Sequence, residues 1–192
     1  MLTPGAETLF RQVPVLPVVV PVAAVAFLGL LWSLRRRGRL SLPRAAVAAA
    51  LCVYLAGTIA NTVFPVFLDK PTGTRPWSAF LNVVPVVGYE PADFAMNVAV
   101  FVPLGVLVAL VVTRPSWTRV LAVAAAISAT IEVTQFVTAT TLGGGHVADV
   151  NDLLSNVVGG LLGAGLLALL DRVPAVRAVV DRFRWQDGSP AR

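Results

Sequence analysis

The sequence contains few charged residues and almost no cysteine or histidine. Charged residues make up 13% of its 192 residues, against about 25% in a typical soluble domain. With one cysteine, Cys52, and one histidine, His146, an internal disulfide and a cysteine-rich metal site are excluded. The chain also has no glycine-rich phosphate-binding loop and no Gly-x-Ser-x-Gly nucleophile motif. The common signatures of soluble enzymes are therefore missing.

Hydrophobic residues dominate the composition. They make up 57% of the chain, and the mean hydropathy is +0.81. Five apolar stretches reach the ~20 residues that a helix needs to cross a bilayer. We expect an all-α, polytopic transmembrane bundle, with spans at Val13–Leu34, Ala45–Phe64, Phe94–Thr113, Val120–Thr140 and Leu153–Leu170. These spans leave no room for a separate soluble domain, so residues 1–192 are expected to form a single membrane domain.

The basic residues alternate between the loops. Of the 15, three fall in the N-terminal segment and the second loop, namely Arg11, Lys70 and Arg75. The other twelve are Arg35, Arg36, Arg37, Arg39, Arg44, Arg114, Arg119, Arg172, Arg177, Arg182, Arg184 and Arg192. The positive-inside rule then predicts an external N-terminus and a cytoplasmic C-terminus, with residues 172–192 as a basic cytoplasmic tail. This asymmetry accounts for the net charge of +5, and nucleic acid is not an expected partner.

Polar side chains of the last three spans fall at one depth, on the predicted outer side. They are Asn97 in the third span, Glu132 and Gln135 in the fourth, and His146, Asp149, Asp152 and Asn156 at the start of the fifth. At about 100° per residue, each helix carries its polar residues on one face. A charge facing lipid costs ~3 kcal/mol or more, so these stripes are expected to line a shared pocket. Asn61 and Asn82 are placed to join it.

A structural interpretation of the same residues is also open. Glu132, Gln135 and Asn97 would then only hold helices together by hydrogen bonds, and Asp149 or Asn151 would only cap the fifth helix. The glycines that continue the polar stripe, at 159, 160 and 163, are expected to let helices pack closely. The single histidine is either an interfacial or capping residue, or a metal ligand, general base or charge partner of Glu132.

Three blocks stand out in this region, namely Asn97-Val-Ala-Val-Phe101-Val-Pro103-Leu104-Gly105, Glu132-Val-Thr-Gln135 and Asp149-x-x-Asp152-x-x-x-Asn156-x-x-Gly159. In their order and spacing they resemble the VanZ-like family of bacterial membrane proteins, named for an accessory protein associated with teicoplanin resistance. Asn82-Val-Val-Pro85 is similar to a segment that often precedes them. The resemblance covers residues 82–165. The family usually has arginine where His146 stands, and histidine is charged only part of the time near neutral pH.

The resemblance implies a multi-pass protein of the bacterial cytoplasmic membrane, in contact with its lipids, but no established reaction. We predict an outward-facing pocket that binds a cell-envelope ligand, namely a glycopeptide antibiotic, a lipid-linked wall precursor or a lipid headgroup. The alternative is a membrane-embedded enzyme in which the carboxylates of Glu132, Asp149 and Asp152 act on a lipid-linked substrate, with or without a divalent metal. The absence of a serine or cysteine nucleophile beside His146 favours the first hypothesis. The sequence assigns no catalytic residue and no cofactor.

Two structural predictions follow from this interpretation. Pro103 removes a backbone hydrogen bond inside the third span, so it should bend that helix. An oxygen of Asp149 or Asp152 should lie within about 6 Å of a polar atom of Glu132, Gln135, Asn97 or His146, the range over which ionisable groups influence one another.

Overall fold

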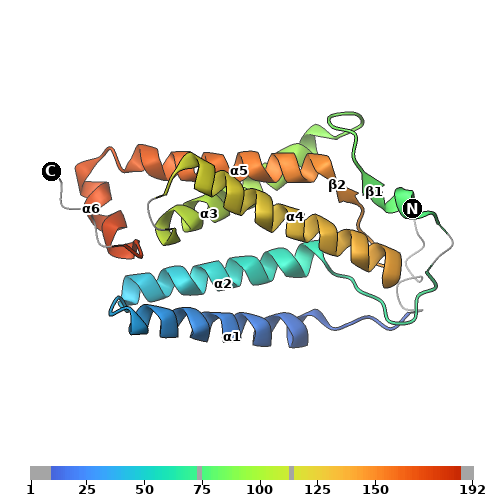
Figure 1. Ribbon diagram of the computed structural model, residues 1–192, viewed down its shortest axis with the longest axis horizontal. Coiled ribbons are helices and arrows are strands. Elements are labelled where there is room, and N and C mark those ends of the chain that lie inside the picture. Colours follow the sequence, from blue (N-terminus) through green and yellow to red (C-terminus); the bar gives the residue numbers. More distant parts are fainter. Residues whose placement is uncertain (1–9, 73–74, 113–114, 187–192) are drawn as a thin grey trace.

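A computed structural model of the protein describes residues 10–72, 75–112 and 115–186 (Figure 1). Arg114 and Arg192, both assigned above to the cytoplasmic side, lie outside these residues, as does the predicted end of the third span at Thr113. The described chain forms α1 (Val15–Arg36), α2 (Leu42–Thr62), the 3-10 helix η1 (Trp77–Phe80), β1 (Leu81–Asn82), α3 (Pro91–Val111), α4 (Trp117–Thr141), β2 (Ala148–Asp149), α5 (Val150–Leu170) and α6 (Pro174–Phe183).

The helices α1 to α5 are long and apolar enough to cross a membrane. Each lies within a few residues of its predicted stretch, so the transmembrane bundle is confirmed. Both α3 and α5 begin three residues earlier than expected. Pro91 occupies the first turn of α3, where a missing N–H costs nothing. Asp149 caps α5 by accepting a hydrogen bond from the backbone N–H of Asn151.

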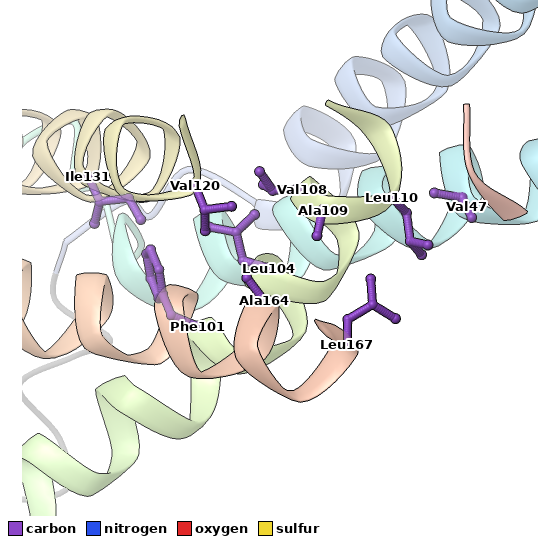
Figure 2. Packing of buried hydrophobic residues seen from close by; sticks show 10 residues of the cluster. All are labelled: Val47, Phe101, Leu104, Val108, Ala109, Leu110, Val120, Ile131, Ala164 and Leu167. Atoms are coloured by element: carbon purple, nitrogen blue, oxygen red, sulfur yellow. The ribbon is translucent and has the colours of Figure 1, made fainter. Parts of the chain in front are cut away.

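The centre of the bundle is formed by α3, α4 and α5. Phe101 and Leu104 of α3 lie between Ile131 of α4 and Ala164 of α5 (Figure 2). Phe101 is 1% exposed and Leu104 is not exposed at all. Cys52, on α2, is buried as a free cysteine, as its isolated position in an apolar span indicated.

The helices α3 and α5 pack backbone against backbone. A Cβ atom added at Gly105 would lie 1.9 Å from the carbonyl oxygen of Gly160, and one added at Gly163 would lie 2.0 Å from that of Val102. Side chains cannot occupy such positions, so only glycine permits this approach. The expected packing role of the glycine stripe is confirmed, in the manner of small-residue interfaces in membranes.

The helix α1 lies at the edge of the bundle, and α2 separates it from the other helices (Figure 1). Two hydrogen bonds join α2 to the centre. Tyr54 donates its hydroxyl to the carbonyl of Val100 at 2.9 Å, and the Gln135 amide donates to the carbonyl of Thr62 at 2.8 Å. The α1–α2 hairpin is therefore attached to the bundle through α2.

The C-terminal segment folds back onto the bundle up to residue 186. The backbone N–H of Trp185 donates to the carbonyl of Leu110 at 3.0 Å, and the Arg44 guanidinium donates to the carbonyl of Arg184 at 2.7 Å. Phe183 and Trp185 pack against the hydrophobic core. This end carries the α1–α2 loop and α6 with their arginines, while β1 and β2 lie at the opposite end (Figure 1). Which end faces the cytoplasm stays a prediction.

The helix α3 continues unbroken through Pro103, which lies inside it. The proline therefore does not end the helix. The bend expected at this residue stays a prediction.

Candidate functional site

The long loop between α2 and α3 is attached to the start of α5. Its strand β1 pairs in parallel with β2, so that Asn82 lies opposite Asp149. The amide of Asn82 also donates to a carboxylate oxygen of Asp149 at 2.9 Å. Asn82 thus joins the polar cluster, as its place in the sequence allowed. Asn61 does not, because its side chain is exposed and bonds the carbonyl of Gly57 in its own helix.

Glu132 is buried, with 8% of its surface exposed. Its carboxylate accepts a hydrogen bond of 2.7 Å from the backbone N–H of Asp149. Asp149 in turn accepts hydrogen bonds of 2.8 Å from the backbone and side-chain nitrogens of Asn151. Glu132 therefore fixes the residue that caps α5, and Asp149 is both a cap and a member of a wider network.

Asp152 lies at the centre of this network. One of its carboxylate oxygens accepts from the hydroxyl of Tyr89 at 2.7 Å and from the amide of Asn97 at 2.6 Å. The Asn97 amide also donates to the Tyr89 oxygen at 2.8 Å. The predicted approach of an aspartate oxygen to Asn97 is therefore confirmed. These contacts join the starts of α3 and α5 to the loop that precedes α3.

Tyr89 was not identified from the sequence. A single tyrosine at a predicted membrane interface was the available signal, because such residues combine an apolar ring with a polar hydroxyl. Burial raises the pKa of Tyr89, and the neighbouring Asp152 carboxylate raises that pKa further. The phenol therefore keeps its proton and donates a hydrogen bond to the carboxylate.

Asn151 holds the tip of the α2–α3 loop. Its side-chain oxygen accepts from the backbone N–H of Val86 at 2.7 Å, and its amide donates to the carbonyl of Val84 at 3.3 Å. Val86 adopts a φ of 69°, a conformation that β-branched residues rarely adopt. Sequence reasoning considered Asn151 only as a cap and missed this role, because the partner is a backbone turn 65 residues away.

Gln135 and Asn156 form separate links between helices. Gln135 bonds α2, as described above, and the amide of Asn156 donates to the hydroxyl of Ser128 at 2.9 Å. The remaining side-chain oxygens of Gln135 and Asn156 are buried and have no hydrogen-bond partner among the described residues. The geometry thus gives these two amides a structural role, and their predicted ligand contacts stay a prediction.

His146 lies apart from the network. It lines a cleft of about 410 Å³ together with Lys70 and Arg75. Of the hydrogen bonds between described residues, none joins His146 to Glu132. The described chain also contains no group of three or more His, Cys, Asp or Glu side chains that could hold a metal ion. The metal-dependent form of the enzyme hypothesis therefore gains no support from this geometry.

The network, here called the acid–amide network, consists of Asn82, Tyr89, Asn97, Glu132, Asp149, Asn151 and Asp152. Its three acids form no salt bridge with any basic residue that the structure describes. Tyr89 and Asn151 also line a second cleft, of about 350 Å³. The site therefore combines carboxylates that have no basic partner among the described residues with a cleft lined by two of their hydrogen-bond partners, Tyr89 and Asn151.

The five apolar helices and the polar network at one end define a multi-pass membrane protein. Residues 51–171 match the model of the VanZ/LLP1 family, and the chain belongs to that family. This confirms the resemblance drawn from the three sequence blocks. Comparison with curated proteins and with solved structures gave no match.

Proposed function

We propose that this protein binds a cell-envelope ligand at the acid–amide network, facing the outside of the bacterial cytoplasmic membrane. The ligand classes are a glycopeptide antibiotic, a lipid-linked wall precursor or a lipid headgroup, and binding would contribute to glycopeptide resistance. One observation carries the proposal. Glu132, Asp149 and Asp152 gather at one end of the bundle without a basic partner among the described residues.

A purely structural network would not need acids at these positions. Asp152 accepts from a phenol and an amide, and a neutral asparagine oxygen could accept both hydrogen bonds. Ionisable side chains near a bilayer cost free energy and usually mark functional positions in membrane proteins. A ligand that presents an ammonium group, or several hydroxyl or amide donors, would compensate them through charge-assisted hydrogen bonds.

Neutral variants of matched shape test this proposal. The full chain would be placed in nanodiscs, and binding of teicoplanin and of a lipid-linked wall precursor would be measured. We expect Glu132→Gln and Asp152→Asn to weaken binding about tenfold, or ~1.4 kcal/mol each. Asp69→Asn is the matched control, since Asp69 is exposed in the α2–α3 loop, lies outside the network and lines neither cleft. It should change affinity less than about twofold, or ~0.4 kcal/mol.

Two results would overturn the proposal. One is that the unaltered protein binds neither probe and also does not bind phosphatidylglycerol, the probe for a lipid headgroup. The other is that Glu132→Gln and Asp152→Asn bind as well as the unaltered protein while remaining folded. In that case the acids only position the loop and the start of α5.

A further inference from the structure

A basic cleft lies at the same end of the bundle as the acid–amide network. Lys70, Arg75 and His146 line it, together with Phe80 of η1 and the glycines at 143, 144 and 145. Its volume is about 410 Å³. Lys70 and Arg75 are two of only three basic residues predicted for the outer side of the membrane, so their convergence on one cleft is unexpected from composition.

Lys70 is held in place by three contacts. Its ammonium donates to the carbonyl of Gly143 at 3.0 Å and lies 4.7 Å from the centre of the Phe67 ring. Its side-chain carbons cross Gly143, where an added Cβ would lie 2.8 Å from the lysine Cδ. Gly143 also has a φ of 62°, which disfavours any other residue. An ammonium has three N–H donors, so hydrogen bonds remain available for a ligand.

The cleft carries no described acidic side chain to balance these cations. Asp69 is next to Lys70 in the chain, but its carboxylate accepts from the backbone N–H of Arg11 at 2.7 Å. No salt bridge between described residues involves Lys70, Arg75 or His146. The cleft is therefore positive, whereas the acid–amide network carries three acids. His146 and Asp149 are three residues apart in the chain, so their Cα atoms are at most about 11 Å apart.

We infer that the basic cleft binds the phosphate group of a membrane lipid, an inference that rests on the proposed function. Clustered lysine and arginine side chains are suited to phosphate oxygens, which accept charge-assisted hydrogen bonds. Phe80 provides apolar surface at the same cleft, and Trp77, three residues earlier in η1, is exposed. The ligand is then a phosphate-bearing lipid, with its phosphate in the basic cleft and the donors of its headgroup at the acid–amide network.

Lipids that differ in their phosphate test this inference. The full chain in phosphatidylcholine nanodiscs would be titrated with undecaprenyl phosphate, with undecaprenol, with phosphatidylglycerol and with inorganic phosphate. We expect undecaprenyl phosphate to bind at least tenfold more tightly than undecaprenol. Lys70→Met and Arg75→Gln should each reduce this preference about tenfold, and Lys70→Arg should retain it. Arg11→Gln is the matched control and should leave it unchanged, because it removes a charge at the same end but outside the cleft.

Each outcome decides the inference. Equal binding of undecaprenyl phosphate and undecaprenol, or an equal loss in Arg11→Gln, would overturn it. Tight binding of phosphatidylglycerol would support it and identify the source as phospholipid headgroups, and equally tight binding of inorganic phosphate would overturn the lipid requirement. The Glu132→Gln variant distinguishes a failure of this inference from a failure of the proposed function. If that variant binds phosphatidylglycerol, whose headgroup hydroxyls are donors, normally while Lys70→Met does not, the basic cleft stands and the role of the acids fails.

Discussion

The two halves of α5 contact their neighbours in different ways. The first turns, up to Asn156, are joined to α3, α4 and the α2–α3 loop by polar side chains. The later turns, around Gly159 and Gly163, touch the backbone of α3 directly. The comparison separates two kinds of constraint on one helix. The glycine half is determined by shape and should tolerate no added atom, whereas the polar half is determined by hydrogen bonding and should tolerate replacements that keep an acceptor.

The largest effect is expected in the glycine half. In Gly163→Ala the new methyl group would lie 2.0 Å from the carbonyl oxygen of Val102, so the two helices must separate. We expect a loss of stability of ~3 kcal/mol, the upper end of the range for overpacked cores. Reversible unfolding in mixed micelles measures it. Gly29→Ala, which meets nothing within 4 Å, should not destabilise the protein, and equal effects of the two variants would contradict backbone packing.

The polar half should respond according to the hydrogen bonds that a variant keeps. Asp152→Ala removes the carboxylate acceptor shared by Tyr89 and Asn97, so two partly buried donors lose one of their hydrogen bonds each. We expect a loss of ~2 kcal/mol in the same unfolding measurement. Asp152→Asn retains an oxygen at this position and should lose clearly less. If both variants unfold alike, the charge of Asp152 itself, and not its acceptor, stabilises the fold.

A smaller and local effect is expected at the tip of the α2–α3 loop. Asn151→Ala removes the side-chain hydrogen bonds to Val84, Val86 and Asp149 but leaves the backbone N–H that also bonds Asp149. Hydrogen exchange should therefore accelerate about tenfold, equivalent to ~1.4 kcal/mol, for the Val86 amide alone. Asn61→Ala is the control, since Asn61 bonds only its own helix among the described residues. Accelerated exchange throughout α5 would instead show that Asn151 supports the helix.

Most of the fold was predictable because long apolar stretches leave a chain few alternatives. All five spans were located within a few residues of their ends, and the role of the glycine stripe followed from its spacing. The approach of Asp152 to Asn97 was also anticipated, since helical phase and depth placed both residues at one end of the bundle. These features depend on periodicity along single helices, which a sequence displays directly.

The contacts missed from the sequence are those made by irregular backbone. Asn151 bonds a turn in a loop, and Tyr89 bonds a residue 63 positions away, so neither has a helical period to reveal it. The grouping of His146 with Asp149 was expected from their proximity in the chain. In the structure Val147 lines the basic cleft and Ala148 already belongs to β2. His146 therefore lies in the basic cleft with Lys70 and Arg75.

The smallest effect concerns the proton of Tyr89, which tests how closely the polar half surrounds it. Burial, and then Asp152, raise the pKa of Tyr89 above its ordinary value of 10.0. The stabilising contribution of the protonated phenol is therefore fully present below about pH 10 and is lost as the pH rises through the raised pKa. The chain has two tyrosines, so an ultraviolet titration of Tyr54→Phe reports Tyr89 alone and should show ionisation above pH 10. Adding Asp152→Asn should lower that pKa only in part, because burial is the larger cause. Ionisation at the ordinary pKa in Tyr54→Phe would mean that the phenol is hydrated and that the network is open to water.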